Sequence, residues 1–290
     1  MLHKNKNAGF SILELSMVVL IVALITAGIS GGRYLLTKSR ITAAEYLTKR
    51  SPVVDIDGLV IWFETTSVNS LLELEANNGS TVSVWRNLAV DNKNATQNAA
   101  GSRPIYSTKA IGFLPALKFD GVDDFLSFDG AVLVGSNYTV FVVERRSSNV
   151  ANNYFIGGTP SVTLNSNLYL GYDTSNSITH NQSGVNGYSF SPVPYIENNP
   201  KIHAFIHDIA NGKKYYQNGG NSGVPQGTSA DKVSLVANAG AAIGQANNGT
   251  LRYYQGYIGE IIMFNRALTD IERADVELYL STKWKIKLNP

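Results

Sequence analysis

The stretch that decides the fold is Tyr138-Thr139-Val140-Phe141-Val142-Val143. In an extended chain its side chains alternate between two faces, and both faces are largely apolar. Such a segment is typical of a strand that is buried on both sides. Similar short apolar runs follow one another after Asp57, separated by Gly, Asn, Asp and Ser, which is the pattern of an all-β domain.

Eight short strands are predicted on these grounds. They are Leu59–Phe63, Val82–Trp85, Ala116–Phe119, Tyr138–Arg145, Leu168–Tyr172, Ile202–Ile209, Lys213–Gln217 and Tyr257–Phe264. Strands at this spacing, joined by turn-forming residues, indicate a two-sheet sandwich. We therefore expect a mainly β chain in which residues 58–290 form one sandwich domain, with a long helix before it and a short helix at its end.

The short C-terminal helix has a recognisable start. Thr269 and Glu272 are spaced as a capping box, in which each side chain bonds to the backbone of the other. Ile271, Ala274, Leu278 and then Thr282 share one face of the helix that follows, and Leu280 and Trp284 add a second apolar edge. We expect this helix to cover a sheet.

Composition excludes several classes of protein. The chain has 44% hydrophobic and only 16% charged residues, which is not the composition of a disordered chain. It has no cysteine, so disulfides, thiolate metal sites and cysteine nucleophiles are excluded. Residues 1–50 hold seven Lys and Arg against two Glu, whereas the remainder is mildly acidic. No basic patch is interleaved with aromatic residues, so nucleic acid is not an expected partner.

An apolar segment follows a short basic leader. Residues 15–32 carry no charge, and together with residues 10–13 the segment reaches the ~20 residues that span a bilayer as a helix. A plain signal anchor is one interpretation, and a signal peptide cut after Gly32 is another. Both leave Glu14 unexplained, although a carboxylate in an apolar helix is costly and marks a functional residue by default.

The string Gly9-Phe10-Ser11-Ile12-Leu13-Glu14, behind the basic leader, resembles the N-terminus of type IV prepilins and pseudopilins. The resemblance implies that prepilin peptidase cuts between Gly9 and Phe10 and that the new N-terminus at Phe10 is methylated. It also implies a role in subunit assembly for Glu14, whose carboxylate would neutralise the terminal amine of a neighbouring subunit in an apolar filament core.

This resemblance sets the expected organisation of the chain. Residues 1–9 are a cleaved leader, residues 10–51 a transmembrane and stalk helix, and residues 52–57 a linker to the sandwich. Pro52 disfavours helix at the residue before it, which places the end of the helix. The expected location is the inner membrane, crossed once with the leader in the cytoplasm and the body in the periplasm, and after assembly a pilus or the cell surface.

A second resemblance concerns the body of the chain. The residues that carry it are Gly58–Trp62, Val84–Asn87, Ala95–Gln97, Arg103-Pro104, Leu114–Gly121, Asp123–Leu126 and Gly256–Thr269. They are similar to concanavalin A-like, laminin G-like jelly roll domains, and the likeness covers residues 57–287. The resemblance implies a jelly roll that binds glycans, binds calcium, hydrolyses polysaccharides or acts as a spacer. This family often has Trp-Leu-Asp-Ala where the chain has Trp62-Phe63-Glu64-Thr65.

Few residues suggest catalysis. Retaining glycosidases need two carboxylates about 5–5.5 Å apart, and the hydrolases related to this fold carry a Glu-x-Asp-x-(x)-Glu string, which is absent here. As a strand, Leu72–Glu75 would put two Glu on one face, but it lies beside a loop and lacks the Asp of that string.

The four histidines do not suggest a metal site. His3 and His180 are scattered, and His203 and His207 share a strand face without an evident third zinc ligand. We therefore expect no enzyme activity, no catalytic residue and no cofactor.

Asp120, Asp123 and Asp124 form the densest cluster of carboxylates in the sequence. Calcium prefers oxygen ligands of this kind, so these three residues are the candidates for a calcium site. The interpretation that we favour is a turn between strands, in which Asp120 caps the turn, Gly121 permits it and Asp124 is solvated.

Three loops have the composition of sugar-binding surfaces, with polar side chains for hydrogen bonds and aromatic rings for stacking. They are Asn149–Asn153, Asp173–Tyr188 and Asn211–Asn221. Ordinary sandwich loops have the same composition, so the sequence leaves both interpretations open.

Together these features predict a minor or tip subunit of a type IV pilus that displays a lectin-like domain for adhesion and glycan binding. The alternative is a pseudopilin of a type II secretion or DNA-uptake system with a structural body, and a membrane-tethered polysaccharide hydrolase ranks last. The expected partners are prepilin peptidase, other pilin subunits through the N-terminal helix, the inner membrane and glycans.

Overall fold

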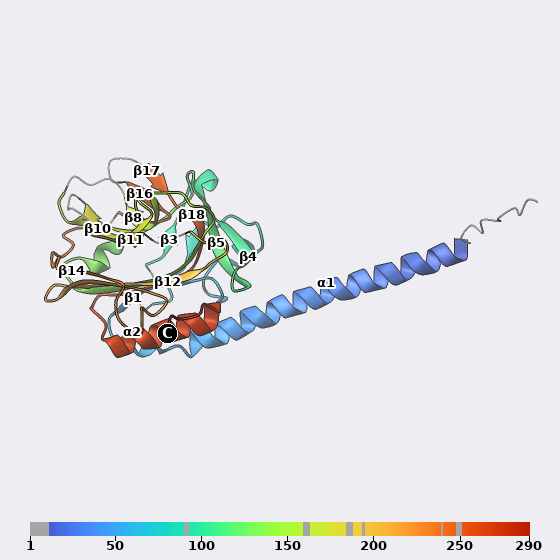
Figure 1. Cartoon of the computed structure of the whole chain (residues 1–290). Coiled ribbons are helices and arrows are strands. Elements are labelled where there is room, and N and C mark those ends of the chain that lie inside the picture. Colours follow the sequence, from blue (N-terminus) through green and yellow to red (C-terminus); the bar gives the residue numbers. More distant parts are fainter. Residues whose placement is uncertain are drawn as a thin grey trace, which may run out of the picture.

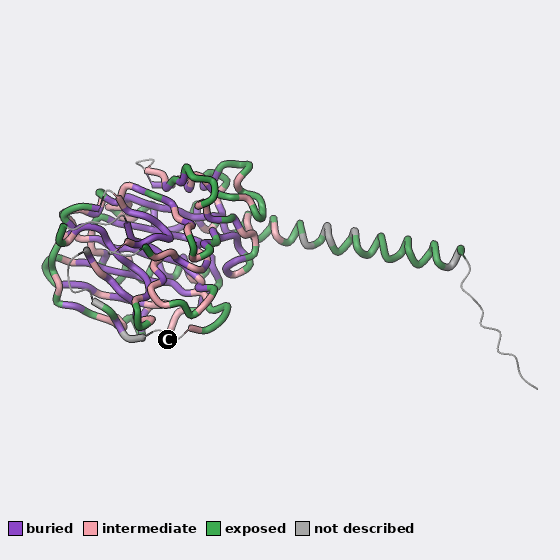
Figure 2. The backbone as a smooth tube through the Cα atoms, turned by 90° about the horizontal axis from the view of Figure 1, so that it is seen from above, coloured by how far each residue is buried: buried purple, intermediate pink, exposed green. Residues whose placement is uncertain are grey.

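A long helix leads into a β-sandwich, and a second helix lies beside the junction of the two (Figure 1). The computed structural model describes residues 12–89, 93–158, 163–183, 188–192, 195–238, 240–247 and 251–290. Figure 2 shows that buried residues fill the sandwich, whereas the helix projects from it with its side chains exposed.

The sandwich consists of two antiparallel sheets and a ribbon. Sheet A follows the order β14 (Gly227–Ser229), β13 (Gly212–Gln217), β12 (Lys201–Asp208), β7 (Tyr138–Arg146), β18 (Gln255–Phe264), β5 (Leu114–Asp120) and β4 (Ile105–Ile111), with β1 (Leu59–Glu64) paired to β18. Sheet B follows the order β11 (Tyr188–Pro192), β10 (Ser177–Ser183), β9 (Ser166–Tyr172), β8 (Asn153–Gly158), β15 (Ala241–Ile243), β6 (Leu126–Phe128), β3 (Ala95–Thr96) and β2 (Val84–Trp85). The ribbon pairs β16 (Gln245–Asn247) with β17 (Leu251–Tyr253). Four short 3-10 helices are η1 (Pro52–Asp55), η2 (Glu73–Glu75), η3 (Ala100–Ser102) and η4 (Gly130–Leu133).

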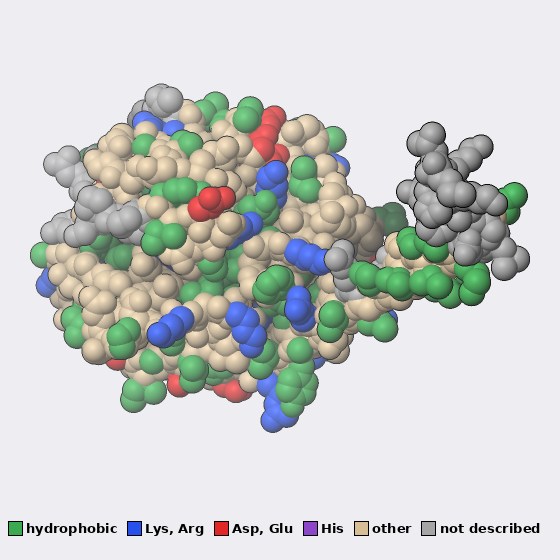
Figure 3. Space-filling view, turned by 45° about the vertical axis from the view of Figure 1, so that its right-hand side comes forward, with side chains coloured by type: hydrophobic (Ala, Val, Ile, Leu, Met, Phe, Trp, Pro, Cys, Tyr) green, Lys and Arg blue, Asp and Glu red, His purple; other side chains and the backbone are tan. Residues whose placement is uncertain are grey.

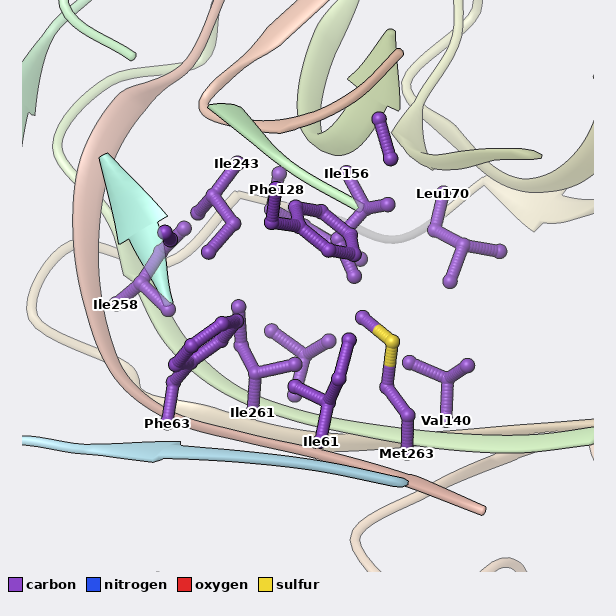
Figure 4. Close-up of a cluster of buried hydrophobic side chains, with 14 of the residues drawn as sticks. Ile61, Phe63, Phe128, Val140, Ile156, Leu170, Ile243, Ile258, Ile261 and Met263 are labelled. Carbon is purple, nitrogen blue, oxygen red and sulfur yellow. The ribbon is translucent and has the colours of Figure 1, made fainter. Parts of the chain in front are cut away.

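The core lies between the two sheets. Every second side chain of β7 points inward, and Val140 meets Met263 from the neighbouring β18 (Figure 4). Phe128 and Leu170 face them from sheet B. Because each sheet contributes one apolar face, the sandwich buries both without a disulfide.

The prediction of a mainly β, two-sheet sandwich is confirmed, and each of the eight predicted strands overlaps an observed one. β8 and β10 were not predicted, because β10 reads Ser-Ile-Thr-His-Asn-Gln-Ser and β8 ends in two glycines. Leu72–Glu75, whose two Glu would share one face of a strand, is not a strand. Glu73–Glu75 forms η2 instead, and the carboxylate of Glu75 accepts a hydrogen bond from the Ser83 hydroxyl.

The first helix, α1, spans Ile12–Lys49. Its side chains are described without a break over residues 15–26 and 34–49, and the apolar ones of residues 15–26 are exposed, as the arm in Figure 3 shows. Gly9 and Phe10 lie outside the described residues, and of Glu14 only the backbone, which is helical, is described. Over the described part of the chain, none of the helices combines the length and the apolar character needed to cross a membrane.

The second helix, α2, spans Asp270–Trp284 and begins with the predicted capping box. The helix covers a sheet as predicted, and the predicted apolar edge of Leu280 and Trp284 is buried, with Val276, against the outer face of sheet A. The other predicted face is wrong, because Ile271 and Leu278 are exposed. The buried face of α2 also contains the charged side chain of Lys283, which a pattern of apolar residues does not reveal.

Lys283 is fully buried between two glutamates. Its Nζ lies 2.8 Å from Glu64 Oε2 on β1 and 2.8 Å from Glu260 Oε2 on β18, and it donates a 2.8 Å hydrogen bond to the hydroxyl of Thr48 on α1. The ammonium keeps the pKa of Glu64 below its usual value, against the opposing effect of burial, while the two carboxylates raise the pKa of Lys283. Glu64 and Lys283 are therefore both charged at neutral pH.

Further donors complete this cluster. The indole N–H groups of Trp62 and Trp284 each donate a 2.7 Å hydrogen bond to Glu260, and the Tyr279 hydroxyl donates a third at 2.8 Å. Burial of ions is tolerated only when their lone pairs and protons find partners, as they do here. The cluster ties β1, β18, α2 and the end of α1 together at one point.

Replacing Lys283 by Ala is expected to destabilise the protein by ~3–5 kcal/mol, because two buried glutamates would lose their counter-ion. Urea unfolding at pH 7 of the wild type and the variant measures this loss. Lys287→Ala removes an exposed lysine close by and is the matched control, with an expected change near zero. A Lys283→Ala protein as stable as the control would contradict the role given to the cluster.

Candidate functional site

The two outer faces of the sandwich differ. The outer face of sheet A is covered by α2 and by the end of α1, where Ala44 packs into the same apolar cluster as Trp284. Figure 1 shows both helices on this side and β8, β10, β16 and β17 on the opposite side. The outer face of sheet B therefore presents its side chains without a covering helix from the described part of the chain.

Four residues on the outer face of sheet B form what we call the tyrosine patch: Tyr154, Tyr169, Arg252 and Tyr253. The rings of Tyr154 and Tyr169 meet edge to face with their centroids 6.3 Å apart. Tyr154 and Tyr253 are half-buried, so part of each side chain reaches solvent. Burial raises the pKa of Tyr154, with Arg252 acting in the opposite direction. Partly exposed rings beside hydrogen-bonding groups can stack on a sugar and bind its hydroxyl groups.

Strand alternation produces the tyrosine patch. On β8 and β9, Phe155 and Leu170 point into the core, so their neighbours Tyr154 and Tyr169 point outward. The ribbon of β16 and β17 then crosses β8 at Gly157, where an added Cβ would lie 2.4 Å from the carbonyl oxygen of Gln245. Only glycine permits this close approach, which brings the ribbon onto the same face.

Polar groups of the ribbon hold the patch in place. The Tyr169 hydroxyl donates a 2.9 Å hydrogen bond to the carbonyl oxygen of Asn247, and the Gln245 side chain donates one of 3.4 Å to the Tyr253 hydroxyl. The rings are therefore oriented before any ligand arrives, which lowers the entropic cost of binding.

The structure brings two of the three candidate sugar-binding loops together. The N–H of Asn152 donates a 2.9 Å hydrogen bond to the carbonyl oxygen of Asp173, so the loops at Asn149–Asn153 and Asp173–Tyr188 meet beside Tyr154. Residues 184–187 of the second loop lie outside the described residues. Asn211–Asn221 lies elsewhere, around β13 of sheet A.

The acidic turn lies at the same end of the sandwich. Carboxylate oxygens of Asp120, Asp123 and Asp124 lie within 4.8 Å of one another. Asp120 accepts hydrogen bonds from the N–H groups that follow it in the turn, and Asp124 accepts one of 3.0 Å from the N–H of Asp120. Burial and then Asp120 raise the pKa of Asp124 to about 7. The contacts of Asp120 are those of the predicted turn, but the prediction that Asp124 is solvated is wrong, because Asp124 is buried. The three oxygens would also suit a calcium ion.

Asp124→Asn is expected to stabilise the protein by about 2 kcal/mol at pH 8 and to leave it unchanged at pH 4. The raised pKa means that folding is favoured while Asp124 is protonated and that this advantage is lost as the pH rises through about 7. The expected change of about 2 kcal/mol is about half of the free energy that the raised pKa corresponds to, because the charges of Asp120 and Asp123, which contribute to it, are partly screened by solvent.

Urea unfolding at the two pH values, with chelator and with millimolar calcium, checks this expectation. Equal stability of both proteins at pH 8 in chelator would contradict it. If calcium stabilised the wild type and not Asp124→Asn, the result would identify the turn as a calcium site.

The histidines belong to the core. His180, His203 and His207 are fully buried, and burial lowers the pKa of each, that of His207 to about 4. His203 contacts Glu144, with Nε2 3.0 Å from Oε1, and its Nδ1 lies 2.8 Å from the Tyr215 hydroxyl. His3 lies outside the described residues. Apart from the acidic turn, the described residues contain no group of three ligands placed to hold a metal ion.

Two hollows of the surface lie along α1. One of about 780 Å³ is lined by Leu35, Tyr46 and Thr282, and another of about 550 Å³ by Tyr34, Val68 and Lys109. The tyrosine patch, in contrast, is an oriented set of rings and polar groups, in which Tyr169 is buried and Tyr154 and Tyr253 are half-buried.

The comparisons with known proteins identify relatives by structure alone. No family model matches the sequence, and no curated protein matches it. The structure is similar to a Trypanosoma rangeli sialidase in complex with 2,3-difluorosialic acid, with 15% identity, a TM-score of 0.52 and a match over 78% of this chain and 33% of that chain. The chain thus spans about a third of the length of this sialidase.

A second similar structure is domain 4 of an extracellular arabinanase from Geobacillus stearothermophilus, in complex with arabinotriose. It has 16% identity and a TM-score of 0.51, and the match covers 76% of this chain and 98% of that domain. At such identities the likeness establishes a shared β-sandwich fold.

These neighbours correct two expectations drawn from the sequence. A pilus or pseudopilus subunit was the expected function, and no enzyme activity was expected. Both similar structures come from enzymes that act on carbohydrate, a sialidase and an arabinanase, and neither is a pilin. The tyrosine patch was also missed, because β8 and β17 were not predicted as strands and alternation within them could not be used.

Proposed function

We propose that the chain is a carbohydrate-binding protein and that the outer face of sheet B holds the sugar. The single observation that carries the proposal is the tyrosine patch, where Tyr154 and Tyr253 are half-buried beside Arg252, next to the ribbon of β16 and β17. Sugar rings have apolar faces that stack on aromatic rings and hydroxyl groups that need polar partners.

The neighbouring structures support the same class of ligand. The arabinanase domain that matches over 98% of its length has arabinotriose bound, so a neutral arabino-oligosaccharide is the first ligand to test. We propose that the strands of the sandwich have the jelly roll arrangement that the sequence resemblance implies. Its two loops at Asn149–Asn153 and Asp173–Tyr188 would border the sugar.

Tyr154→Ala and Tyr253→Ala are each expected to weaken binding of arabinotriose about fivefold, since a stacked ring contributes ~1 kcal/mol. Isothermal titration calorimetry on the purified full chain measures the affinities. Tyr46→Ala removes an exposed tyrosine on α1 and is the matched control, with unchanged affinity expected. Equal affinities for all four proteins, or no saturable binding by the wild type, would overturn the proposal.

We also propose that the N-terminal segment is processed by prepilin peptidase and holds the body at the inner membrane. The support is the string from Gly9 to Glu14 together with the exposed apolar side chains of α1 over residues 15–26. Processing is a property of this segment and does not depend on what the sandwich binds.

Mass spectrometry of the chain from cells that contain prepilin peptidase is expected to find Phe10 as the N-terminal residue, carrying one methyl group. Gly9→Val is expected to keep the leader, because the cleavage site is lost. An intact leader in the wild type, or a chain that begins at Arg33, would contradict the proposal.

A further inference from the structure

The hairpin between β4 and β5 turns beside α1 and presents a phenylalanine to solvent. Ile111 pairs with Leu114, so Gly112 and Phe113 form a two-residue turn, in which φ is 56° and 64°. A bulky side chain rarely adopts this left-handed conformation. Phe113 adopts it and is 64% exposed. The fold therefore holds an apolar ring outward at a position where Gly or Asn is the usual choice.

Neighbouring elements fix the direction of this turn. A Cβ added at Gly112 would lie 2.2 Å from the carbonyl oxygen of Trp284 at the end of α2, so only glycine permits the hairpin to pass this close. The guanidinium of Arg40 on α1 lies over the ring of Phe113, with Cζ 4.7 Å from the centroid. The ring is thus held beside α1 by backbone packing and by a cation–π contact.

Several cations lie around this ring, and together with it they form what we call the hairpin patch: Lys38, Arg40, Lys109, Phe113 and Lys285. Arg40, Phe113 and Lys285 line a hollow of about 190 Å³. Lys38 and Lys285 line the hollow of about 780 Å³, and Lys38 and Lys109 line the one of about 550 Å³. Figure 3 shows Lys and Arg side chains gathered on the face of the body that adjoins the arm.

The protein does not neutralise the charges of the hairpin patch. All four cations are exposed, and none forms an ion pair with a described residue. Glu45 lines the hollow of Lys38 and Lys109, but its carboxylate lies 3.0 Å from Nζ of Lys49. The other two hollows are lined by no Asp or Glu from the described part of the chain. An exposed ring among unpaired cations complements a surface that is both apolar and negatively charged.

The hairpin patch lies just beyond the apolar part of α1. The charge-free stretch ends at Gly32, and Lys38 and Arg40 follow it at ~9 and 12 Å along the helix. The headgroup region of a bilayer is roughly 5–8 Å thick on each side. Long side chains on a helix lean toward its N-terminus, so both cations can reach this region when the apolar stretch is in a membrane. Tyr34, which is 66% exposed, lies at the boundary, where aromatic residues are preferred.

We propose that the hairpin patch binds the headgroups of anionic phospholipids, with the ring of Phe113 inserted among them. This rests on the proposal that the N-terminal segment holds the body at the membrane, and it adds a second contact, made by the body itself. The cations attract the phosphate groups of the lipids, and the ring reaches the apolar boundary below them. The second contact fixes the tilt of the body relative to the membrane.

The test places a tryptophan at either end of β5. Phe113→Trp reports on the hairpin patch, and Val122→Trp is the matched control, because Val122 is 69% exposed beyond the other end of the strand. The three native tryptophans are at most 3% exposed and contribute a constant background. The full-length variants are reconstituted in phosphatidylcholine liposomes, with or without phosphatidylglycerol, that contain a lipid with a nitroxide on its headgroup.

With phosphatidylglycerol present, the nitroxide lipid is expected to quench the fluorescence of Phe113→Trp at least threefold more than that of Val122→Trp. Adding Arg40→Gln and Lys109→Gln to Phe113→Trp is expected to remove at least half of this quenching, and high salt is expected to weaken it. Adding Lys232→Gln removes an exposed lysine beyond β14, at the opposite edge of sheet A, and is expected to leave the quenching unchanged.

Equal quenching at the two positions, or quenching that does not depend on phosphatidylglycerol, would overturn the inference. A blue-shifted emission of Phe113→Trp that the nitroxide lipid does not quench would indicate that protein covers the patch, and would overturn it too. Flotation of the same liposomes measures the anchoring separately. Protein that floats without selective quenching contradicts the hairpin patch alone, whereas protein that does not float contradicts the anchoring and the inference with it.

Discussion

One buried ammonium between two buried carboxylates holds the chain together. Lys283 joins Glu64, from the first strand, to Glu260, from the last, and binds Thr48 at the end of α1. Each of these charges would be costly in the core alone, so the elements that carry them are stable only when all are in place. Where the resembling family often has Asp after Trp, this chain has the longer Glu64, which is the residue that Lys283 meets. The first and last parts of the body are thereby brought to one face of sheet A.

The positions of the two helices determine which outer face of the sandwich is accessible to a ligand. Because α2 and the end of α1 cover sheet A, the outer face of sheet B is the one that can meet a ligand. The tyrosine patch lies on that face. A structural neighbour of nearly the same extent as the sandwich has an oligosaccharide bound. The outer face of sheet A is covered by helices, and the outer face of sheet B carries the proposed sugar-binding groups.

Local patterns predicted the fold well and the site poorly. The alternation at Tyr138–Val143 and the capping box at Thr269 depend on residues close in sequence, so both could be recognised. The apolar edge of α2 at Leu280 and Trp284 was also recognised, but the buried Lys283 was not, because its partners come from strands about 20 and 220 residues earlier in the chain. Tyr154 and Tyr253 come from strands 99 positions apart and meet only after the sheet has formed. The composition of the loops beside these tyrosines suggested sugar binding, but it did not identify the two rings themselves.

The central claim is that sugar binds to the outer face of sheet B. The most direct measurement is a crystal structure of the full chain with arabinotriose bound. We expect electron density for the sugar against the rings of Tyr154 and Tyr253, with its hydroxyl groups near Arg252. Density confined to the hollows along α1, or to the acidic turn at Asp120, would contradict the account.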